Sequence, residues 1–235
     1  MDAMIRTEHL RRIYNPGMDK VVALADINLT VARGEILCIL GTSGSGKSTL
    51  LNMLAGLEKP SHGFVYVNNQ EITRMSERKL TKFRQQNIGF IFQSYNLMND
   101  ISALENVAMP LEFRGVSPKI RRAAAAKMLD AVGLGDRIKH KPREMSGGQQ
   151  QRVGIARAFV SKPAIIFADE PTGNLDSKTT DTVMRLMVRM AKEIGQTFVI
   201  VTHDPETSVY CDRVITLVDG EIISDVRNEE TKGVE

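Results

Sequence analysis

The sequence predicts one α/β domain whose core is a largely parallel sheet. Along most of the 235 residues, short apolar runs alternate with patterns of helical spacing, which is typical of parallel strands joined by helices. The run Ile36–Leu40 is continuously apolar, as expected of a strand buried on both faces. A glycine-rich loop and a helical pattern follow it directly. The length suits a single domain with a substantial hydrophobic core.

The elements of the first half of the chain can be assigned in order. Ile27–Val31 alternates like a strand, and Gly34 marks a turn. After the buried run, Leu50, Leu51 and Leu54 recur at helical spacing. The pattern then predicts, in order, the helix Ser48–Leu57, the strand Val65–Val67, the charged helix Ser76–Gln86 and the strand Ile88–Phe92.

The middle of the chain differs from the rest because it is mostly helical. Ala103–Phe113 and Pro118–Val132 are the expected helices, and Pro118 suits a first helical turn. We therefore expect residues 94–161 to form a helical subdomain inserted between two parts of one sheet domain, 1–93 and 162–226. The second part is predicted to hold the strand Ala164–Ala168, the helix Thr179–Ile194 and the strands Thr197–Thr202 and Val214–Val218. Residues 227–235 are polar and are expected to fray.

Composition excludes several classes of protein. The net charge of +3 is too small to predict a nucleic-acid partner. The two cysteines, Cys38 and Cys211, lack metal-ligand spacing, so they predict neither a zinc site nor a disulfide framework. Met1–Leu10 lacks the apolar core of a signal peptide, and no apolar run approaches the ~18 residues of a membrane-spanning helix. We expect a cytoplasmic protein that reaches a membrane only through a partner.

The loop after the buried run matches the phosphate-binding pattern G-x-x-x-x-G-K-[ST] in full, between a strand and a helix. Its glycines allow backbone N–H groups to surround an anion, and the start of the helix adds the positive end of its dipole. Lys47 is placed to neutralise charge on the β- and γ-phosphates, and Ser48 to ligate Mg²⁺. A flexible Gly/Ser turn is the alternative. The expected nucleotide contacts are Gly41, Thr42, Ser43, Gly44, Ser45, Gly46, Lys47, Ser48 and Thr49.

An acidic pair, Asp169 and Glu170, follows the apolar run Ala164–Ala168. A buried strand delivers the next side chains to the carboxyl edge of the sheet, where ligands bind in open α/β folds. Asp169 is placed to hold Mg²⁺, directly or through water. Glu170 faces the attacking water, which it orients or deprotonates. The alternative is a strand that ends in surface acids.

A second anion site is predicted at the helix that follows Ser146, Gly147, Gly148 and Gln149. Ser146 is a good helix cap, and the glycines allow close approach of the backbone. Because the phosphate loop already surrounds much of one nucleotide, this site is offered to a nucleotide held by a second copy of the chain. A two-fold dimer then contains two composite sites. An ordinary capped helix is the alternative.

In combination, these motifs resemble those of the ATP-binding cassette family, from about Met4 to Ile223. Met145–Gln149 resembles the family's signature sequence, with Met145 where leucine is usual. The resemblance implies a P-loop NTPase fold with a mostly parallel core sheet, an N-terminal antiparallel β subdomain and the helical insertion. It also implies hydrolysis of Mg²⁺-bound ATP by a homodimer, in which the signature of one subunit contacts the ATP of the other.

The resemblance assigns further roles. Gln93 resembles the glutamine that reaches Mg²⁺ and the attacking water, and that reports nucleotide state to the helical subdomain. His203 resembles the histidine that contacts the γ-phosphate. Tyr14 resembles the aromatic residue that stacks on adenine, with packing in the N-terminal sheet as the alternative. The implied catalytic residues are Lys47, Gln93, Glu170 and His203; the implied Mg²⁺ ligands are Ser48, Gln93 and Asp169; and Asn174, Leu175 and Asp176 resemble the loop that links the two sites across the dimer.

Two stretches, Asp169–Asp176 and Phe92–Leu97, resemble the branch that contains lipoprotein-release, macrolide-export and antimicrobial-peptide-resistance ATPases. Its members pair with a separate permease, here expected to have four spans and a large external domain. The chain would then sit on the inner face of the cytoplasmic membrane.

Three alternatives remain open. The first is a regulatory or scaffolding module of the cell-division type. The second is a soluble cassette protein of DNA repair or translation, although those usually carry coiled coils or two cassettes. The third is a nucleotide kinase, which leaves the signature unexplained.

Overall fold

The fold is described by a computed structural model that covers residues 2–15 and 20–228. Its centre is a six-stranded sheet in the order β11-β10-β4-β9-β8-β7, parallel except for the β10–β11 pair. The strands are β4 (Ile36–Leu40), β7 (Ile88–Phe92), β8 (Ile165–Asp169), β9 (Thr197–Thr202), β10 (Arg213–Val218) and β11 (Glu221–Arg227). The mostly parallel core sheet expected from the sequence is confirmed.

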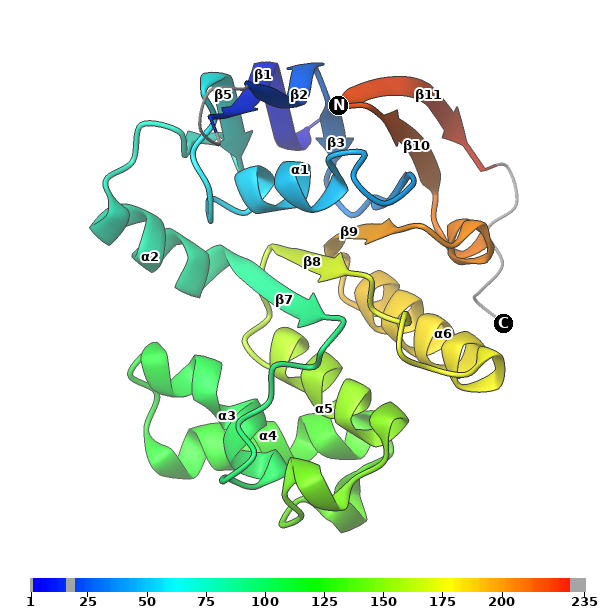
Figure 1. The fold of residues 1–235 in the computed structure, drawn as a ribbon. Helices are drawn as coiled ribbons and strands as arrows, with labels where there is room; N and C mark the ends of the chain where they lie inside the picture. The colour runs from blue at the N-terminus through cyan, green and yellow to red at the C-terminus, as the bar shows by residue number, and fades with distance from the viewer. Residues whose placement is uncertain (1, 16–19, 229–235) are drawn as a thin grey trace.

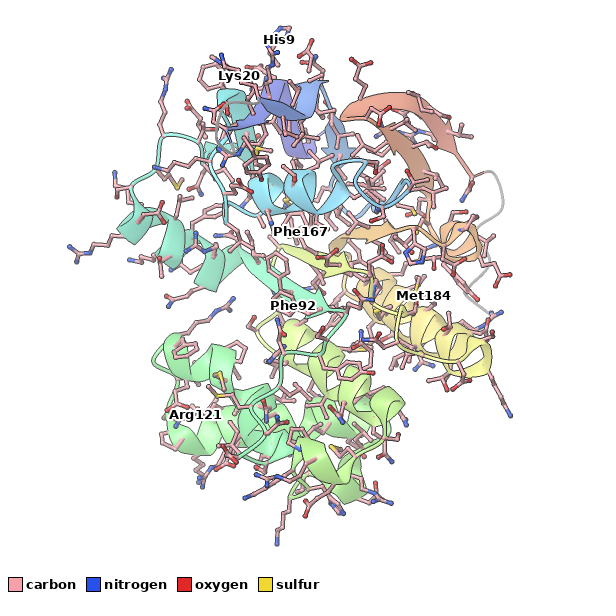
Figure 2. The ribbon with its side chains drawn as sticks, in the orientation of Figure 1. His9, Lys20, Phe92, Arg121, Phe167 and Met184 are labelled. Atoms are coloured by element: carbon pink, nitrogen blue, oxygen red, sulfur yellow. The ribbon has the colours of Figure 1, made fainter. Side chains whose placement is uncertain are left out.

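Both faces of this sheet are covered, which explains why its strands read as continuous apolar runs. Successive side chains alternate between the faces. On β8, Ile165 and Phe167 belong to one buried cluster, together with α1 (Lys47–Leu54), while Ile166 and Ala168 belong to a second cluster with α6 (Ser177–Glu193). Figure 2 shows Phe167 on the side of the sheet toward α1, with Met184 on α6.

A second, antiparallel sheet lies above α1 (Figure 1). It has the order β2-β1-β5-β6, and β3 also pairs with β1. Its strands are β1 (Ala3–Tyr14), β2 (Val21–Ile27), β3 (Thr30–Ala32), β5 (His62–Val67) and β6 (Gln70–Glu71). Buried residues of this sheet share one cluster with α1 and with the central sheet, so α1 is packed between the two sheets. This is the antiparallel β subdomain that the family resemblance implied.

Helices predominate between β7 and β8, at the bottom of Figure 1. The helices are α3 (Ala103–Phe113), α4 (Pro118–Ala131), the short turns η1 (Gly135–Arg137) and η2 (Pro142–Glu144), and α5 (Gly147–Phe159). Val107, Leu129 and Val153 bury one side chain from each long helix in the cluster below the central sheet. The remaining helices are α2 (Glu77–Asn87), before β7, and η3 (Pro205–Tyr210), before β10. No helix in the described part of the chain is both long and apolar enough to cross a membrane.

The structure corrects several expectations at the level of single elements. The strand expected at Ile27–Val31 is wrong: β2 ends at Ile27 and β3 begins at Thr30, because the Thr7 hydroxyl bonds the Ile27 carbonyl and the Leu29 N–H and interrupts the ladder with β1 there. The expected fraying does not begin at residue 227: Arg227 pairs with Arg213 in the β10–β11 ladder, and the Asn228 amide donates to the carbonyls of Ser208 and Cys211. Residues 229–235 lie outside the described part.

Candidate functional site

Four of the expected site residues are brought to one place by the parallel strands. The carboxyl ends of β7, β8, β9 and β4 are level, since Phe92 pairs with Asp169, Asp169 with Val201, and Leu40 with Thr202. The first residues after these strands therefore meet at one edge of the sheet: Gln93, Glu170, His203 and Gly41.

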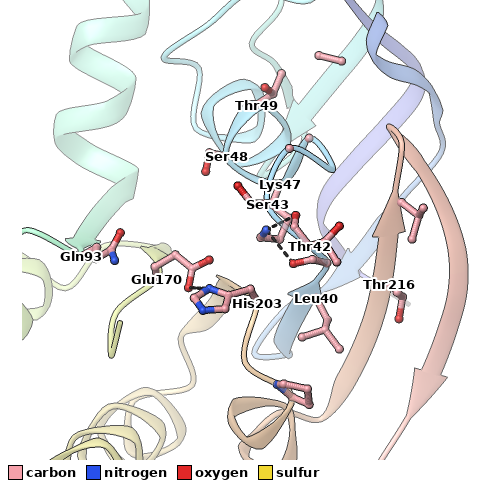
Figure 3. Close-up of a pocket in the computed structure, with 16 residues that line it drawn as sticks. Leu40, Thr42, Ser43, Lys47, Ser48, Thr49, Gln93, Glu170, His203 and Thr216 are labelled. Carbon is pink, nitrogen blue, oxygen red and sulfur yellow. Dashed lines mark hydrogen bonds and ion pairs between the residues drawn. The ribbon is translucent and has the colours of Figure 1, made fainter. Parts of the chain in front are cut away.

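A pocket of about 820 Å³ opens at this edge (Figure 3). Its lining includes most of the predicted nucleotide contacts and all four predicted catalytic residues. The lining residues that were predicted are Gly41, Thr42, Ser43, Gly44, Gly46, Lys47, Ser48, Thr49, Gln93, Glu170 and His203. Ala23, Leu40, Pro205, Thr216 and Val218 complete the lining, and these the sequence did not predict.

The phosphate loop has the geometry of an anion site. Gly46 caps α1 with φ near 100°, a backbone conformation that favours glycine, and a Cβ there would lie 2.5 Å from the carbonyl oxygen of Ala23. No side chain caps α1, so the N–H groups of its first turn face the pocket without a side-chain partner. The Lys47 ammonium donates to the carbonyl oxygens of Gly41 and Thr42, both at 2.9 Å, and is therefore held by its own loop.

The acidic pair lies opposite this loop. Asp169 is half-buried, and its Oδ1 accepts a hydrogen bond from the Ser48 hydroxyl at 3.3 Å. Burial raises the pKa of the Asp169 carboxyl, and the neighbouring charge of Glu170 acts in the same direction, against the lowering effect of Ser48 and Lys47. A cation beside Ser48 and Asp169 would relieve this cost. Oxygen ligands of this kind suit Mg²⁺, which uses few carboxylates and several phosphate or water oxygens.

Glu170 and His203 form a pair across the pocket. His203 Nδ1 lies 2.8 Å from Glu170 Oε2, and the Thr202 hydroxyl donates to the same oxygen at 3.4 Å. Glu170 has φ near 46°, in the left-handed region that non-glycine residues rarely adopt, and its N–H donates to Val201. Strain at this position is balanced by that backbone bond and by the two side-chain contacts, which together fix the carboxylate. Thr202 was not predicted, although its place at the end of a buried strand is a usable signal.

Three predicted groups of residues lie away from the pocket lining of the same chain. Ser146 caps α5 through a reciprocal pair of bonds with Gln149, at 3.4 and 2.9 Å, and none of residues 146–149 lines the pocket. Asp176 caps α6, and the backbone N–H of Thr179 lowers the pKa of its carboxyl. Asn174 and Leu175 lie in the loop between β8 and α6.

Tyr14 is also not a lining residue. Its hydroxyl donates to Glu58 at 2.7 Å, and the Arg12 guanidinium lies 4.5 Å from the centre of its ring. These contacts hold Tyr14 against neighbouring side chains of the N-terminal region, and its contact with adenine stays a prediction.

Comparison with known proteins identifies the family. A family model described as ABC transporter matches residues 24–173, which is more than half of the chain. The chain belongs to the ABC transporter family. It is an ATP-binding subunit of that family, and its reaction is ATP hydrolysis.

Individual cassettes of this family are closely similar. The lipoprotein-releasing system ATP-binding protein LolD of Idiomarina loihiensis is 45% identical over 93% of this chain and 96% of its own. The macrolide export ATP-binding/permease protein MacB of Bartonella henselae is 44% identical over 95% of this chain, which spans about a third of that protein's length (34%). The dimeric ATP-binding cassette MJ0796, solved in a post-hydrolysis state with ADP and Pi, superposes with a TM-score of 0.89 and 42% identity, over 95% of this chain and 98% of that one.

Proposed function

We propose that this cassette drives a separate membrane permease, in the branch that releases or exports lipoproteins, macrolides or peptides. The proposal rests on two findings together. A phosphate loop and the Glu170–His203 pair meet in one pocket. Relatives 44–45% identical to this chain are named for lipoprotein release and macrolide export. These names favour transport over the regulatory, cell-division type of module.

The loop and helix α1 would hold the triphosphate. Its negative charge would draw the Lys47 ammonium away from the two loop carbonyls that it now contacts, because a phosphate oxygen is the stronger partner. The uncapped first turn of α1 would bind the same anion. Thr42, Ser43, Ser45 and Thr49 belong to this loop and its helix, and Tyr14 would supply the adenine contact.

Hydrolysis would begin with a water held between Glu170 and the γ-phosphate. Glu170 would orient that water and accept its proton as the water oxygen bonds to the γ-phosphorus and the bond to the leaving ADP breaks, with His203 beside the γ-phosphate. Ser48, Asp169 and Gln93 would hold Mg²⁺, which neutralises charge on the β- and γ-phosphates when bound. Lys47 stabilises the charge that develops on the transferred group.

The second half of each site would come from a partner copy. Ser146, Gly147, Gly148 and Gln149 begin a capped helix away from the pocket of their own chain, which leaves this N-terminus available to a nucleotide on the other copy. The loop Asn174–Asp176 would link the two sites. Closure of the dimer would then move a permease with four spans and a large external domain, from the inner face of the cytoplasmic membrane.

The decisive experiment reconstitutes the chain with the membrane protein encoded beside it. We expect that ATPase activity in proteoliposomes rises several-fold when a lipoprotein, a macrolide or a cationic peptide is supplied as cargo. An ATPase that no co-purified membrane protein stimulates, and that responds to none of these three cargo classes, would contradict the transport proposal and favour the scaffolding alternative.

A further inference from the structure

The short segment Gln93–Asn96 connects β7 to the helical region through an unusual backbone turn. Tyr95 and Asn96 have φ values near 59° and 47°, in the left-handed region that side-chain-bearing residues rarely adopt. The N–H groups of Tyr95 and Asn96 donate to Phe92 and Ser94, at 3.2 and 2.6 Å. The turn therefore uses its donors internally and directs several of its carbonyl groups to side chains of other elements.

The far end of this segment is held by Arg157 of α5. Its guanidinium donates Nη2 to the carbonyl oxygen of Tyr95 at 2.8 Å and Nη1 to that of Asn96 at 2.5 Å. A charged, planar donor that reaches two adjacent carbonyls holds them in one orientation. The segment is thus fixed to the helix that Ser146 caps.

The near end is held by the loop after β8. The Asn174 side-chain amide donates from Nδ2 to the carbonyl oxygen of Gln93 at 2.9 Å. The residue before it, Gly173, leaves room for the Gln93 side chain, because a Cβ there would lie 2.7 Å from Gln93 Nε2. One dipeptide therefore fixes the main chain of Gln93 and shapes the space beside its side chain.

We propose that Asn174 is a positioning residue for Gln93 within its own subunit. Gln93 directly follows β7 and lines the pocket with Lys47 and Glu170. Arg157 holds the far end, so the hydrogen bond from Asn174 to the Gln93 carbonyl decides whether the main chain at Gln93 keeps this orientation and its side chain stays turned to the pocket. This inference rests on the proposed role of Gln93 in hydrolysis. It differs from the cross-dimer role that the family resemblance gives to Asn174.

The test measures ATPase kinetics of the full chain with saturating Mg²⁺. We expect N174A to lower kcat roughly tenfold while KM for ATP stays within about twofold, because a misplaced Gln93 affects the reaction more than nucleotide binding. N174D is nearly the same size but has no donor, and should lose as much as N174A. The matched control is N99A, an exposed asparagine in the stretch that follows, which should behave as wild type.

A double-mutant cycle with Q93A distinguishes a role of Asn174 through Gln93 from a cross-dimer role and from a purely structural role. If Asn174 acts through Gln93, adding N174A to Q93A should leave kcat unchanged, so the double variant should have the same kcat as Q93A alone. ATP-dependent dimerisation of E170Q should also be unaffected by N174A. Losses that multiply in the double variant, or a dimer that N174A abolishes, would overturn the inference and place Asn174 in a cross-dimer or purely structural role.

The same experiment distinguishes this inference from the proposed function. A wild-type chain that does not hydrolyse Mg-ATP would overturn the proposed function itself. A wild-type chain that is active, with N174A and N174D as active as N99A, would overturn only the role of Asn174.

Discussion

At the scale of single residues, the pocket contains groups whose backbone or charge is held in an unfavourable state in the folded chain. Glu170 adopts a left-handed backbone, and Asp169 has a raised pKa because it is partly buried. Lys47 lies against two carbonyl oxygens of its own loop. The arrangements at Asp169 and Lys47 would improve when a cation and a triphosphate enter, because each charged group would then meet a charge of opposite sign.

Replacing Lys47 by alanine tests the loop. The change removes the ammonium that would meet the β- and γ-phosphates, so we expect ATP affinity to fall roughly 10- to 100-fold, the range of a hydrogen bond to a charged group. Isothermal titration calorimetry with ATP provides the measurement. Lys59→Ala, at an exposed lysine beyond the C-terminal end of α1, is the control. Unchanged affinity in the Lys47 variant would refute its phosphate role.

Replacing Glu170 by glutamine tests the carboxylate. Glutamine keeps the size of the side chain but accepts no proton, so turnover should fall by roughly 10²-fold or more while ATP still binds. The unreacted ATP should then hold two copies together, which light scattering with and without ATP would detect. Glu206→Gln, an exposed position within η3, is the control. Hydrolysis at the wild-type rate would remove Glu170 from this role.

At the scale of elements, the strands and helices that carry short-range signals were predicted well. The helix Ala103–Phe113 and the strand Thr197–Thr202 are confirmed at both ends. Apolar periodicity and the Ser102 cap indicate the helix, and a continuous apolar run indicates the strand. β1 was not identified, because a register shift near Arg12 and a left-handed His9 interrupt its alternation. β11 was missed because its side chains are mostly exposed.

The site shows the same division. The loop Gly41–Ser48 and the pair Asp169–Glu170 were readable because each motif is contiguous in the chain. The bonds from Thr202 to Glu170 and from Asn174 to Gln93 join residues 32 and 81 positions apart. Contacts at that separation depend on strand order, which a single sequence does not specify.

The β10–β11 hairpin offers a pH-dependent test. Arg213 donates to both carboxylate oxygens of Asp225, at 2.6 and 2.5 Å, and this hydrogen bond lowers the pKa of Asp225 from its ordinary 3.8. A carboxyl group with a lowered folded pKa contributes stability above its unfolded pKa and loses it as pH falls through the folded value. Asp225→Asn should therefore cost stability near pH 7 and progressively less below pH ~4.

The expected loss at pH 7 is about 1 kcal/mol or less, because the carboxylate is half-exposed and solvent screens the pair. Urea unfolding followed by circular dichroism at several pH values provides the measurement. Asp136→Asn is the matched control, since that carboxylate makes one contact, at 3.3 Å, with the adjacent Arg137. A loss for Asp225→Asn that stays constant with pH would show that the pair does not titrate as inferred.

At the scale of the whole molecule, the central question is whether one site is built from two chains. Within a single copy, the capped helix N-terminus at Ser146 does not line the pocket that contains Lys47. A similar cassette is known as a dimer with ADP and Pi. A change at Ser146 should therefore disable the nucleotide of the partner copy and leave the nucleotide of its own copy bound.

Mixing two disabled variants tests this arrangement, with Glu170→Gln present in both so that ATP persists. Ser146→Asp keeps a good helix cap but presents a negative charge to the phosphates, while Lys47→Ala weakens ATP binding in its own pocket. Neither variant alone should form an ATP-dependent dimer. Their mixture should form heterodimers, because the ATP bound through the intact Lys47 of one copy meets the intact Ser146 of the other. Gel filtration should recover about one ATP per dimer. If both functions belonged to the same chain, mixing would rescue nothing.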